Sequence, residues 1–290
     1  MGWLEDAEAL ANMPIPGPGV SAETRHRLDT MPVEALAALF CAHQYLTLRE
    51  LTHESHDAML YFDHLPHEQP ERAFALVLAV LRAEAPKPVK MELNTRLFGA
   101  LLYRHGEAMI ETIEREVMTN AQLRWLAGGA CNSSHPDVSR RMQAFADQDA
   151  WWEDYEERRR PKRVIDFPRL SAVELARAWV DHKVCPHKDQ DENSDALEEH
   201  MTALQRDDPD AVLDVILEIL KIETDVAVLS FLAAGPLEDL VSDRTIDRIE
   251  REAQADEKFR ELLRGVWYWN EDHELKRRLD AITGLNYANS

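Results

Sequence analysis

The stretch "TIDRIEREAQADEKFRELLRGVW" (residues 245–267) repeats an earlier stretch of the same chain, "MIETIEREVMTNAQLRWLAGGAC" (residues 109–131). A shift of 136 positions brings eight identical residues together. They are Ile110/Ile246, Ile113/Ile249, Glu114/Glu250, Arg115/Arg251, Glu116/Glu252, Arg124/Arg260, Leu126/Leu262 and Gly129/Gly265. In each stretch the two isoleucines are three residues apart, which places them on one face of a helix. The chain therefore contains one helical unit twice.

The repeat continues upstream at a slightly different shift. "LAALFCAH" (residues 36–43) matches "LARAWVDH" (residues 175–182) at a shift of 139, and an apolar helical pattern follows at that same shift. Its members are Phe74, Val77, Leu78 and Leu81, matching Leu213, Ile216, Leu217 and Leu220. Gly99 and Leu101 then match Gly235 and Leu237 at 136. We expect the missing three residues to lie at the connector "APKPVK" (residues 85–90), because connectors absorb changes in length.

Helix-end signals agree between the copies and predict the fold class. "SAVE" (residues 171–174) is a capping box, and Gln69-Pro70 and Asp208-Pro209 place proline at a first helical position. No alternating strand pattern occurs. We predict an all-α protein of two tandem small helical-repeat domains, each of five or six helices, stacked as a short solenoid. The expected boundaries are an irregular leader (1–30), the first copy (31–146), a linker (147–170) and the second copy (171–290).

Composition excludes several classes of function. The chain of 290 residues has a formal net charge of −21, which disfavours binding to nucleic acid or anionic lipid and favours basic partners. It has no apolar run long enough to span a bilayer and no basic leader typical of secretion, and its three cysteines form no CxxC. We expect a cytoplasmic protein without a cofactor. The basic run "RRRPKR" (residues 158–163) directly follows "EDYEE" and is predicted to be a solvated linker.

The second copy resembles a bacterial family of domains of unknown function. The resemblance rests on "LARAWVDH", "DPDAVLDVILEIL", "LAAGPLEDL" and "IDRIEREAQADEKFRELLRGVW", and it covers residues 171–282. The first copy resembles a degenerate member, with "GALLYRHGE" and "GGACNSS" in place of the acidic turn and the Gly-Val-Trp. The resemblance implies a small all-helical domain and no particular activity.

Two groups of residues have metal-ligand chemistry. "HESHDAMLYFDHLPHE" contains His53, His56, Asp57, Asp63, His64 and His67. Histidine and aspartate together can bind zinc or iron, so a metal-dependent hydrolase is one alternative function. The competing interpretation is a polar helix face rich in histidine, since the second copy lacks these histidines. "HKVCPH" supplies His182, Cys185 and His187, but only His200 could add a fourth zinc ligand. We therefore assign neither a metal site nor catalytic residues.

Two acidic segments are predicted to bind a partner. The first, within "DQDENSDALEE", supplies Asp189, Asp191, Glu192 and Asp195. The second, within "GVWYWNED", places Tyr268 and Trp269 beside Glu271 and Asp272, which is typical of an aromatic anchor ringed by charge. "WWEDY" (residues 151–155) repeats that composition, although its tryptophans can equally pack the domain junction.

The sequence therefore favours a non-enzymatic acidic module that binds another protein. Its most concrete form is an immunity or antitoxin-like inhibitor of a basic bacterial toxin. A helical-repeat scaffold in a bacterial defence or signalling assembly is a further alternative.

Overall fold

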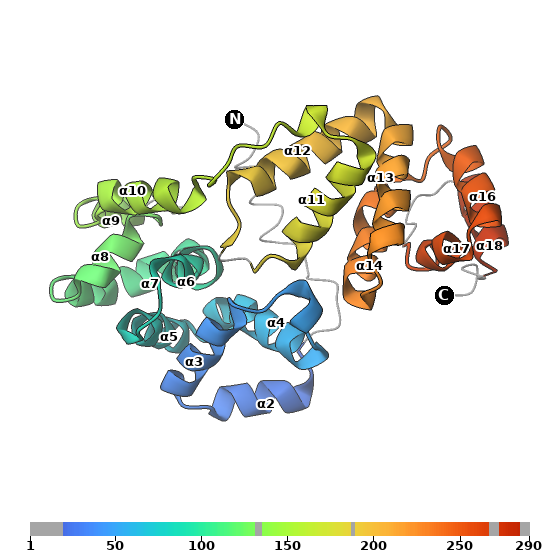
Figure 1. The fold of residues 1–290 in the computed structure, drawn as a ribbon. Coiled ribbons are helices and arrows are strands. Elements are labelled where there is room, and N and C mark those ends of the chain that lie inside the picture. Colours follow the sequence, from blue (N-terminus) through green and yellow to red (C-terminus); the bar gives the residue numbers. More distant parts are fainter. Residues whose placement is uncertain (1–19, 131–134, 187–188, 267–272, 285–290) are drawn as a thin grey trace.

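The structure is a computed structural model that describes residues 20–130, 135–186, 189–266 and 273–284 (Figure 1). Within these ranges every regular element is helical and no strand occurs. The prediction of an all-α protein is therefore confirmed. Figure 1 shows the elements of the first copy in blue to green and those of the second copy in yellow to red.

The first copy begins with α2 and ends with α10. Its long helices pack α3 against α5 and α4 against α7. The elements are α2 (Ala22–Thr30), α3 (Val33–His43), η1 (Leu48–Glu50), α4 (His53–Glu68), α5 (Pro70–Arg82), α6 (Lys87–Leu93), η2 (Asn94–Phe98), α7 (Gly99–Val117), α8 (Ala121–Ala127), α9 (Pro136–Gln143) and α10 (Gln148–Arg159).

The second copy repeats this order from α11 onward. Its elements are η3 (Phe167–Arg169), α11 (Ala172–Val184), α12 (Glu192–Asp207), α13 (Pro209–Ile222), α14 (Val226–Leu232), η5 (Ala233–Leu237), α15 (Glu238–Leu240), α16 (Ile246–Ala255), α17 (Glu257–Leu263) and α18 (His273–Thr283). Ser171 and Glu174 form the predicted capping box, and Asp208 caps α13 before Pro209. These helix starts are confirmed.

The two copies keep one register from α3 to the π-helical turn η2. The starts of α3, α4, α5 and α6 and the whole of η2 recur 139 residues later in α11, α12, α13, α14 and η5. Helix α8 then recurs 136 residues later as α17. The three-residue difference therefore lies after the π-helical turn. Our prediction that it lies at "APKPVK" was wrong, and in the register of the helices Gly99 corresponds to Glu238 rather than to Gly235.

The chain loses these three residues by breaking one helix. In the first copy α7 runs on from η2, with a kink at His105 (φ −125°, ψ 15°). In the second copy the helix stops at Leu240, Val241 is extended, and a turn leads into α16. The hydroxyl of Thr245 accepts a hydrogen bond from the amide of Ser242 (3.2 Å) and stabilises this turn. The "GPLEDL" segment is thus a π-helical turn followed by the short α15.

A repeated ion pair closes each copy. Arg141 of α9 donates two hydrogen bonds to Glu114 of α7, at 2.7 and 2.6 Å. Arg278 of α18 does the same to Glu250 of α16, at 2.7 and 2.8 Å. Bidentate arginine–carboxylate pairs fix orientation as well as distance. The identity of Glu114 and Glu250 therefore has a structural cause that the sequence comparison did not give.

Each copy has its own hydrophobic core. One core runs from Val20 to Trp151 and the other from Phe167 to Leu279. Leu78 and Leu217, which we predicted on the buried stripes, are only partly buried at the margins of these cores. We therefore expect truncation there to cost less than the 2–5 kcal/mol, roughly, of a fully buried leucine.

The two copies touch mainly through η1 and the end of α10. Leu48 of η1 packs against the second core, and Arg49 forms an ion pair with the buried Glu223 (2.7 Å). Arg159 of α10 forms an ion pair with Asp195 of α12. The junction therefore joins side chains of both copies.

The predicted leader and linker both contain ordered helices. Residues 20–30 include α2, which Ser21 caps and which buries Leu28 in the first core. Residues 148–159 form α10, which buries Trp151 in the same core. Only residues 160–166 connect the copies without regular structure. The first copy therefore extends further at both ends than we predicted.

Candidate functional site

The acidic segment around α12 is partly used within the chain. Asp191 caps α12 by accepting a hydrogen bond from the amide of Asn193 (2.9 Å), and Asp195 pairs with Arg159. Asp189 is exposed, and Glu192 is exposed in the first turn of the helix. At least two of these four predicted partner-binding residues therefore also have a structural role.

Glu198, in the same segment, is bound by two side chains of α11. His182 lies 3.2 Å from Glu198 Oε1, and the Lys183 ammonium also donates to that oxygen. These hydrogen bonds, chiefly that of His182, lower the pKa of Glu198 from 4.5 to about 2, against the opposing effect of burial. The equivalent His43 of the first copy instead lies 3.1 Å from the Ser55 carbonyl oxygen, and burial lowers the pKa of its ring. Each of these two histidines therefore contacts the helix that follows its own.

We expect Glu198→Gln to destabilise the protein at neutral pH but not in strong acid. A depressed carboxyl pKa contributes stability above the ordinary value of 4.5, and this contribution is lost as the pH falls towards 2. Because the Glu198 side chain is half exposed, the loss at pH 7 should be about 1 kcal/mol or less. Urea unfolding at pH 7 and pH 2 measures it, with the exposed neighbour variant Glu199→Gln as control. A difference between Glu198→Gln and the native chain that is the same at both pH values would contradict this assignment.

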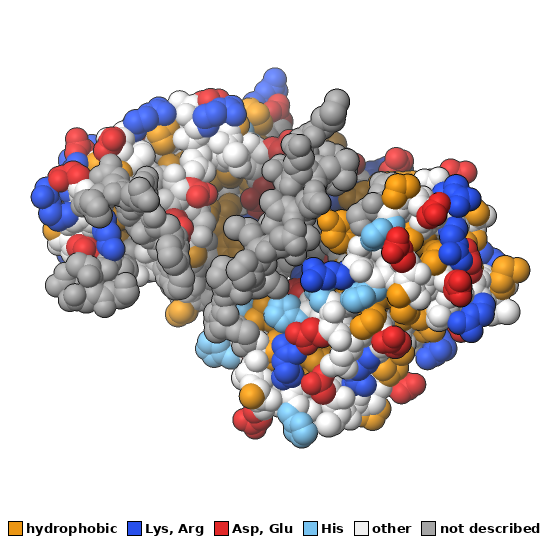
Figure 2. All heavy atoms as spheres, turned by 180° about the vertical axis from the view of Figure 1, so that it is seen from behind, with side chains coloured by type: hydrophobic (Ala, Val, Ile, Leu, Met, Phe, Trp, Pro, Cys, Tyr) orange, Lys and Arg blue, Asp and Glu red, His pale blue; other side chains and the backbone are white. Residues whose placement is uncertain are grey.

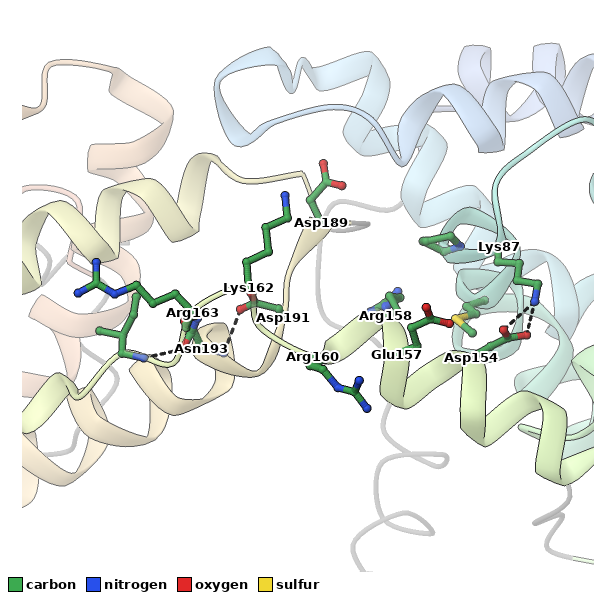
Figure 3. Close-up of a pocket in the computed structure, with 13 residues that line it drawn as sticks. Lys87, Asp154, Glu157, Arg158, Arg160, Lys162, Arg163, Asp189, Asp191 and Asn193 are labelled. Carbon is green, nitrogen blue, oxygen red and sulfur yellow. Dashed lines mark hydrogen bonds and ion pairs between the residues drawn. The ribbon is translucent and has the colours of Figure 1, made fainter.

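A groove of about 660 Å³ lies at the junction of the copies (Figure 3). Lys87 of α6 binds Asp154 of α10 on one side, and Asn193 of α12 holds the connector through the Arg163 carbonyl and the Ile165 amide on the other. Among its lining residues in the described part of the chain there is no serine, cysteine or histidine. The described lining of the groove therefore offers no nucleophile of those types and no imidazole base.

The basic run 158–163 divides between structure and solvent. Arg158 forms an ion pair with Glu92 (3.1 Å), and both side chains are nearly buried, so this residue does not belong to a solvated linker. Arg160, Lys162 and Arg163 are in or beside the groove, where Figure 3 shows their charged ends pointing in different directions. Because these cations do not converge on one point, the groove is not arranged to hold a phosphate.

Helix α10 packs against α6 and α8. Trp151 lies against Trp125, with ring centroids 4.8 Å apart. A Cβ atom on Gly129 would lie 2.3 Å from Trp151 Cε2, so only glycine leaves room for that indole. Asp154 accepts hydrogen bonds from Lys87 Nζ (2.6 Å) and Trp125 Nε1 (2.8 Å). One face of α10 is thus fixed in the first copy.

The opposite face of α10 presents an exposed aromatic side chain among acids. Asp149, Trp152, Glu153 and Glu156 follow the spacing i, i+3, i+4, i+7, and all four are exposed. We call these four residues the α10 stripe. Trp152 is 52% exposed and packs edge-on against Tyr155 at 5.4 Å. The guanidinium of Arg159 lies 5.5 Å from the Tyr155 ring centroid, so the indole rests on an ordered support.

The second predicted aromatic anchor, Tyr268, Trp269, Glu271 and Asp272, lies outside the described residues. Of the two anchors proposed from composition, only the one in "WWEDY" can thus be located. Its two tryptophans have opposite environments, because Trp151 is 5% exposed and buried in the first core.

The histidine-rich segment 53–68 forms α4, and its acids have other partners. Asp57 accepts from the Ser21 amide (3.3 Å), and Asp63 accepts from Arg96 (2.9 Å). Figure 2 shows histidine side chains dispersed among acidic and basic ones on this face of the first copy. Across the described ranges, no three His, Cys, Asp or Glu side chains come together to hold a metal ion.

The segment "HKVCPH" borders a second hollow of about 420 Å³, lined by His182 and Cys185 among others. Within it Cys185 Sγ lies 3.6 Å from the Pro186 carbonyl oxygen, and His182 contacts Glu198. His187 lies outside the described residues. The described part of this segment thus shows its two possible ligands engaged with other groups.

Comparison with known proteins places the chain in a family. No curated protein and no solved structure matches it significantly. No helix in the described part of the chain is long and apolar enough to cross a membrane. The model of a family of unknown function (DUF6869) matches residues 50–150 and again residues 184–285, which together are more than half of the chain. The resemblance seen in the sequence is thus confirmed for both copies, and the chain belongs to this family of unknown function (DUF6869) as a tandem pair.

Proposed function

We propose that this protein is an acidic, non-enzymatic binding module for a basic partner protein. The observation that carries the proposal is the α10 stripe, in which the half-exposed Trp152 stands among the exposed carboxylates of Asp149, Glu153 and Glu156. Exposed aromatic residues supply much of the energy of protein interfaces, while surrounding charges steer the partner. A net charge of −21 strengthens attraction of a basic protein.

The arrangement of the stripe supports an interface rather than a disordered acidic patch. Trp152 is held by Tyr155, and Tyr155 is covered by Arg159, which reaches across to Asp195 of the second copy. Side chains that are already ordered lose less conformational entropy when they bind. The most concrete version of this function is an immunity or antitoxin-like inhibitor of a basic bacterial toxin.

A comparative pull-down from the native host tests this proposal. Three baits are compared: the native chain, Trp152→Ala and the control Met118→Ala. Met118 is a suitable control because it is also exposed and apolar, but it directly follows α7 and is not part of the α10 stripe. We expect a basic protein to be recovered with the native chain and the control. Trp152→Ala should lose about tenfold or more of it, because a hot-spot truncation costs about 2 kcal/mol. The proposal would be overturned if Trp152→Ala recovered the same proteins as the native chain. It would also be overturned if the protein that is lost with Trp152→Ala were acidic.

The charges of the stripe should act on a different step. Replacing Asp149 with asparagine and Glu153 and Glu156 with glutamine should slow association with the recovered partner and reduce its salt dependence, while dissociation changes little. Trp152→Ala should instead accelerate dissociation. Stopped-flow measurements at two salt concentrations separate the two effects.

A further inference from the structure

The connector between the copies (residues 160–166) has an unpaired backbone edge near its centre. The side-chain amide of Asn193 donates to the Arg163 carbonyl oxygen (2.8 Å) and accepts from the Ile165 amide (3.1 Å) (Figure 3). Such a pair of bonds, two residues apart, is typical of an extended chain, in which successive residues direct their N–H and C=O groups to opposite sides. Asn193 thus holds one edge, and the N–H and C=O of Val164 belong to the other. No group in the described part of the chain forms a hydrogen bond with them.

Both ends of the connector are anchored. Arg159, the last residue of α10, forms an ion pair with Asp195 of α12. Arg160 is extended (φ −62°, ψ 118°), as a residue before proline prefers, and Pro161 follows it. At the other end, Phe167 is buried in the second core. A segment that is already ordered loses less conformational entropy when another chain pairs with it.

The side chains around this edge are apolar and basic. Val164 is 80% exposed, more than any other large hydrophobic side chain in the described ranges, and Ile165 is 36% exposed. Valine and isoleucine favour extended pairing. Arg160, Lys162 and Arg163 are also exposed, and no ion pair in the described part of the chain engages them. Salt screens charges over about 10 Å at roughly 0.1 M ionic strength, so these cations matter more here than the distant acids.

The acids of the adjacent groove do not pair with these cations. Asp154 binds Lys87 (2.6 Å), and Asp191 caps α12. The other two acids in the described lining, Glu157 and Asp189, form no ion pair with the connector. The basic side chains of the connector therefore remain available to an acidic ligand.

We propose that the connector binds an extended acidic segment of another protein, which adds as a strand along the edge at Val164. The main chain of that segment pairs with the N–H and C=O of Val164, its apolar side chains contact Val164 and Ile165, and its carboxylates face Lys162 and Arg163. Cations that are spread along the connector cannot converge on one phosphate, but they match acids that are spaced along an extended chain. The site shares no residue with the α10 stripe and does not depend on the proposed function.

Two other occupants fit the same edge less well. A second copy of this chain would pair connector with connector and bring like charges opposite each other, which destabilises a strand pair. A single-stranded nucleic acid would meet the cations, but it binds through aromatic side chains on which its bases stack. The connector has no aromatic residue, and the net charge of −21 repels a phosphate chain.

A fluorescein-labelled peptide, Thr-Glu-Glu-Val-Val-Glu-Glu-Thr-amide, provides the probe. Two acids beside two valines complement the sequence Lys162-Arg163-Val164-Ile165, and their repetition allows either strand direction. Fluorescence anisotropy with the full-length protein should show saturable binding. Replacing the four glutamates with glutamine should weaken binding at least about tenfold, and N-methylation of both valines, which removes main-chain donors but keeps the charge, should do the same.

Variants of the protein locate the site. Lys162→Gln with Arg163→Gln should weaken binding of the probe at least about tenfold. The matched control, Arg82→Gln with Arg251→Gln, removes two exposed cations of α5 and α16 and should change binding less than about twofold. Val164→Pro removes the outward N–H and should also weaken binding at least about tenfold, whereas Val164→Ile keeps the amide and should retain it. Circular dichroism checks that all variants remain folded.

Several results would overturn the proposal. They are the absence of saturable binding, equal effects of the two double variants, and undiminished binding of the N-methylated peptide, because charge alone would then hold the probe. Tighter binding of fluorescein-labelled oligothymidylate than of the peptide would identify a nucleic acid instead. A native dimer that Val164→Pro converts to monomer would identify a second copy.

This proposal and the proposed function can fail separately. Trp152→Ala should leave binding of the probe unchanged, and Val164→Pro should leave recovery of the basic partner unchanged. Loss of the basic partner with Trp152→Ala, without any binding of the probe, would uphold the proposed function and overturn this inference. Probe binding that depends on Val164, without any basic partner in the pull-down, would do the reverse.

Discussion

Replacing Trp151 with alanine is expected to destabilise the first copy by about 3–5 kcal/mol, while replacing the adjacent Trp152 should cost about 0.5 kcal/mol or less. Trp151 is 5% exposed and fills the space above Gly129, whereas Trp152 is 52% exposed. Removing the buried indole leaves a cavity and detaches α10 from α8. Removing the exposed one leaves the core intact.

Urea unfolding of the two single variants measures this difference. Hydrogen exchange followed by mass spectrometry locates it, and the loss of protection in Trp151→Ala should be centred on α6, α8 and α10. Equal destabilisation by the two substitutions, or a loss of protection centred on α16 to α18, would show that α10 is not packed as described.

The repeat and the helix ends were predictable because they depend on local chemistry. Capping residues and prolines act within one turn, so Ser171, Asp208 and Pro209 identify their helices without knowledge of the rest of the chain. The position of the length change was not predictable in the same way. The second copy breaks its helix at Leu240, and Gly99 and Leu101 also match Gly235 and Leu237 three residues upstream of their structural equivalents, so the sequence match placed the change too early.

Helix α10 was missed because its inward face is small. Trp151 is its one buried residue, and the rest of its sequence is acidic or basic. A single tryptophan gives no repeated apolar spacing, so the segment has the composition of a linker. Helix α10 is held in place by Gly129, which leaves room for Trp151, and by Lys87, which binds Asp154. Both residues are distant from α10 in the sequence.

The chemical type of the candidate binding residues could be predicted from the sequence, but their contacts in the folded chain could be predicted only in part. Acidic composition indicated a basic partner, yet Asp195 pairs with Arg159, 36 residues earlier, and no local pattern shows such a contact.

Thiol labelling tests most directly that α10 covers α6 in the first copy, whereas the matching face of α14 in the second copy is accessible. Met91 on α6 is 3% exposed, whereas Ser230, at the same position of α14, is exposed. In a chain with Cys41→Ser, Cys131→Ser and Cys185→Ser, we compare Met91→Cys with Ser230→Cys. The thiol at 230 should react at the rate of an accessible cysteine. The thiol at 91 should react at least about 100-fold more slowly, because it can react only after a local opening of the structure that costs about 3 kcal/mol. Trp151→Ala should accelerate this reaction. Equal labelling rates at the two positions would contradict the account.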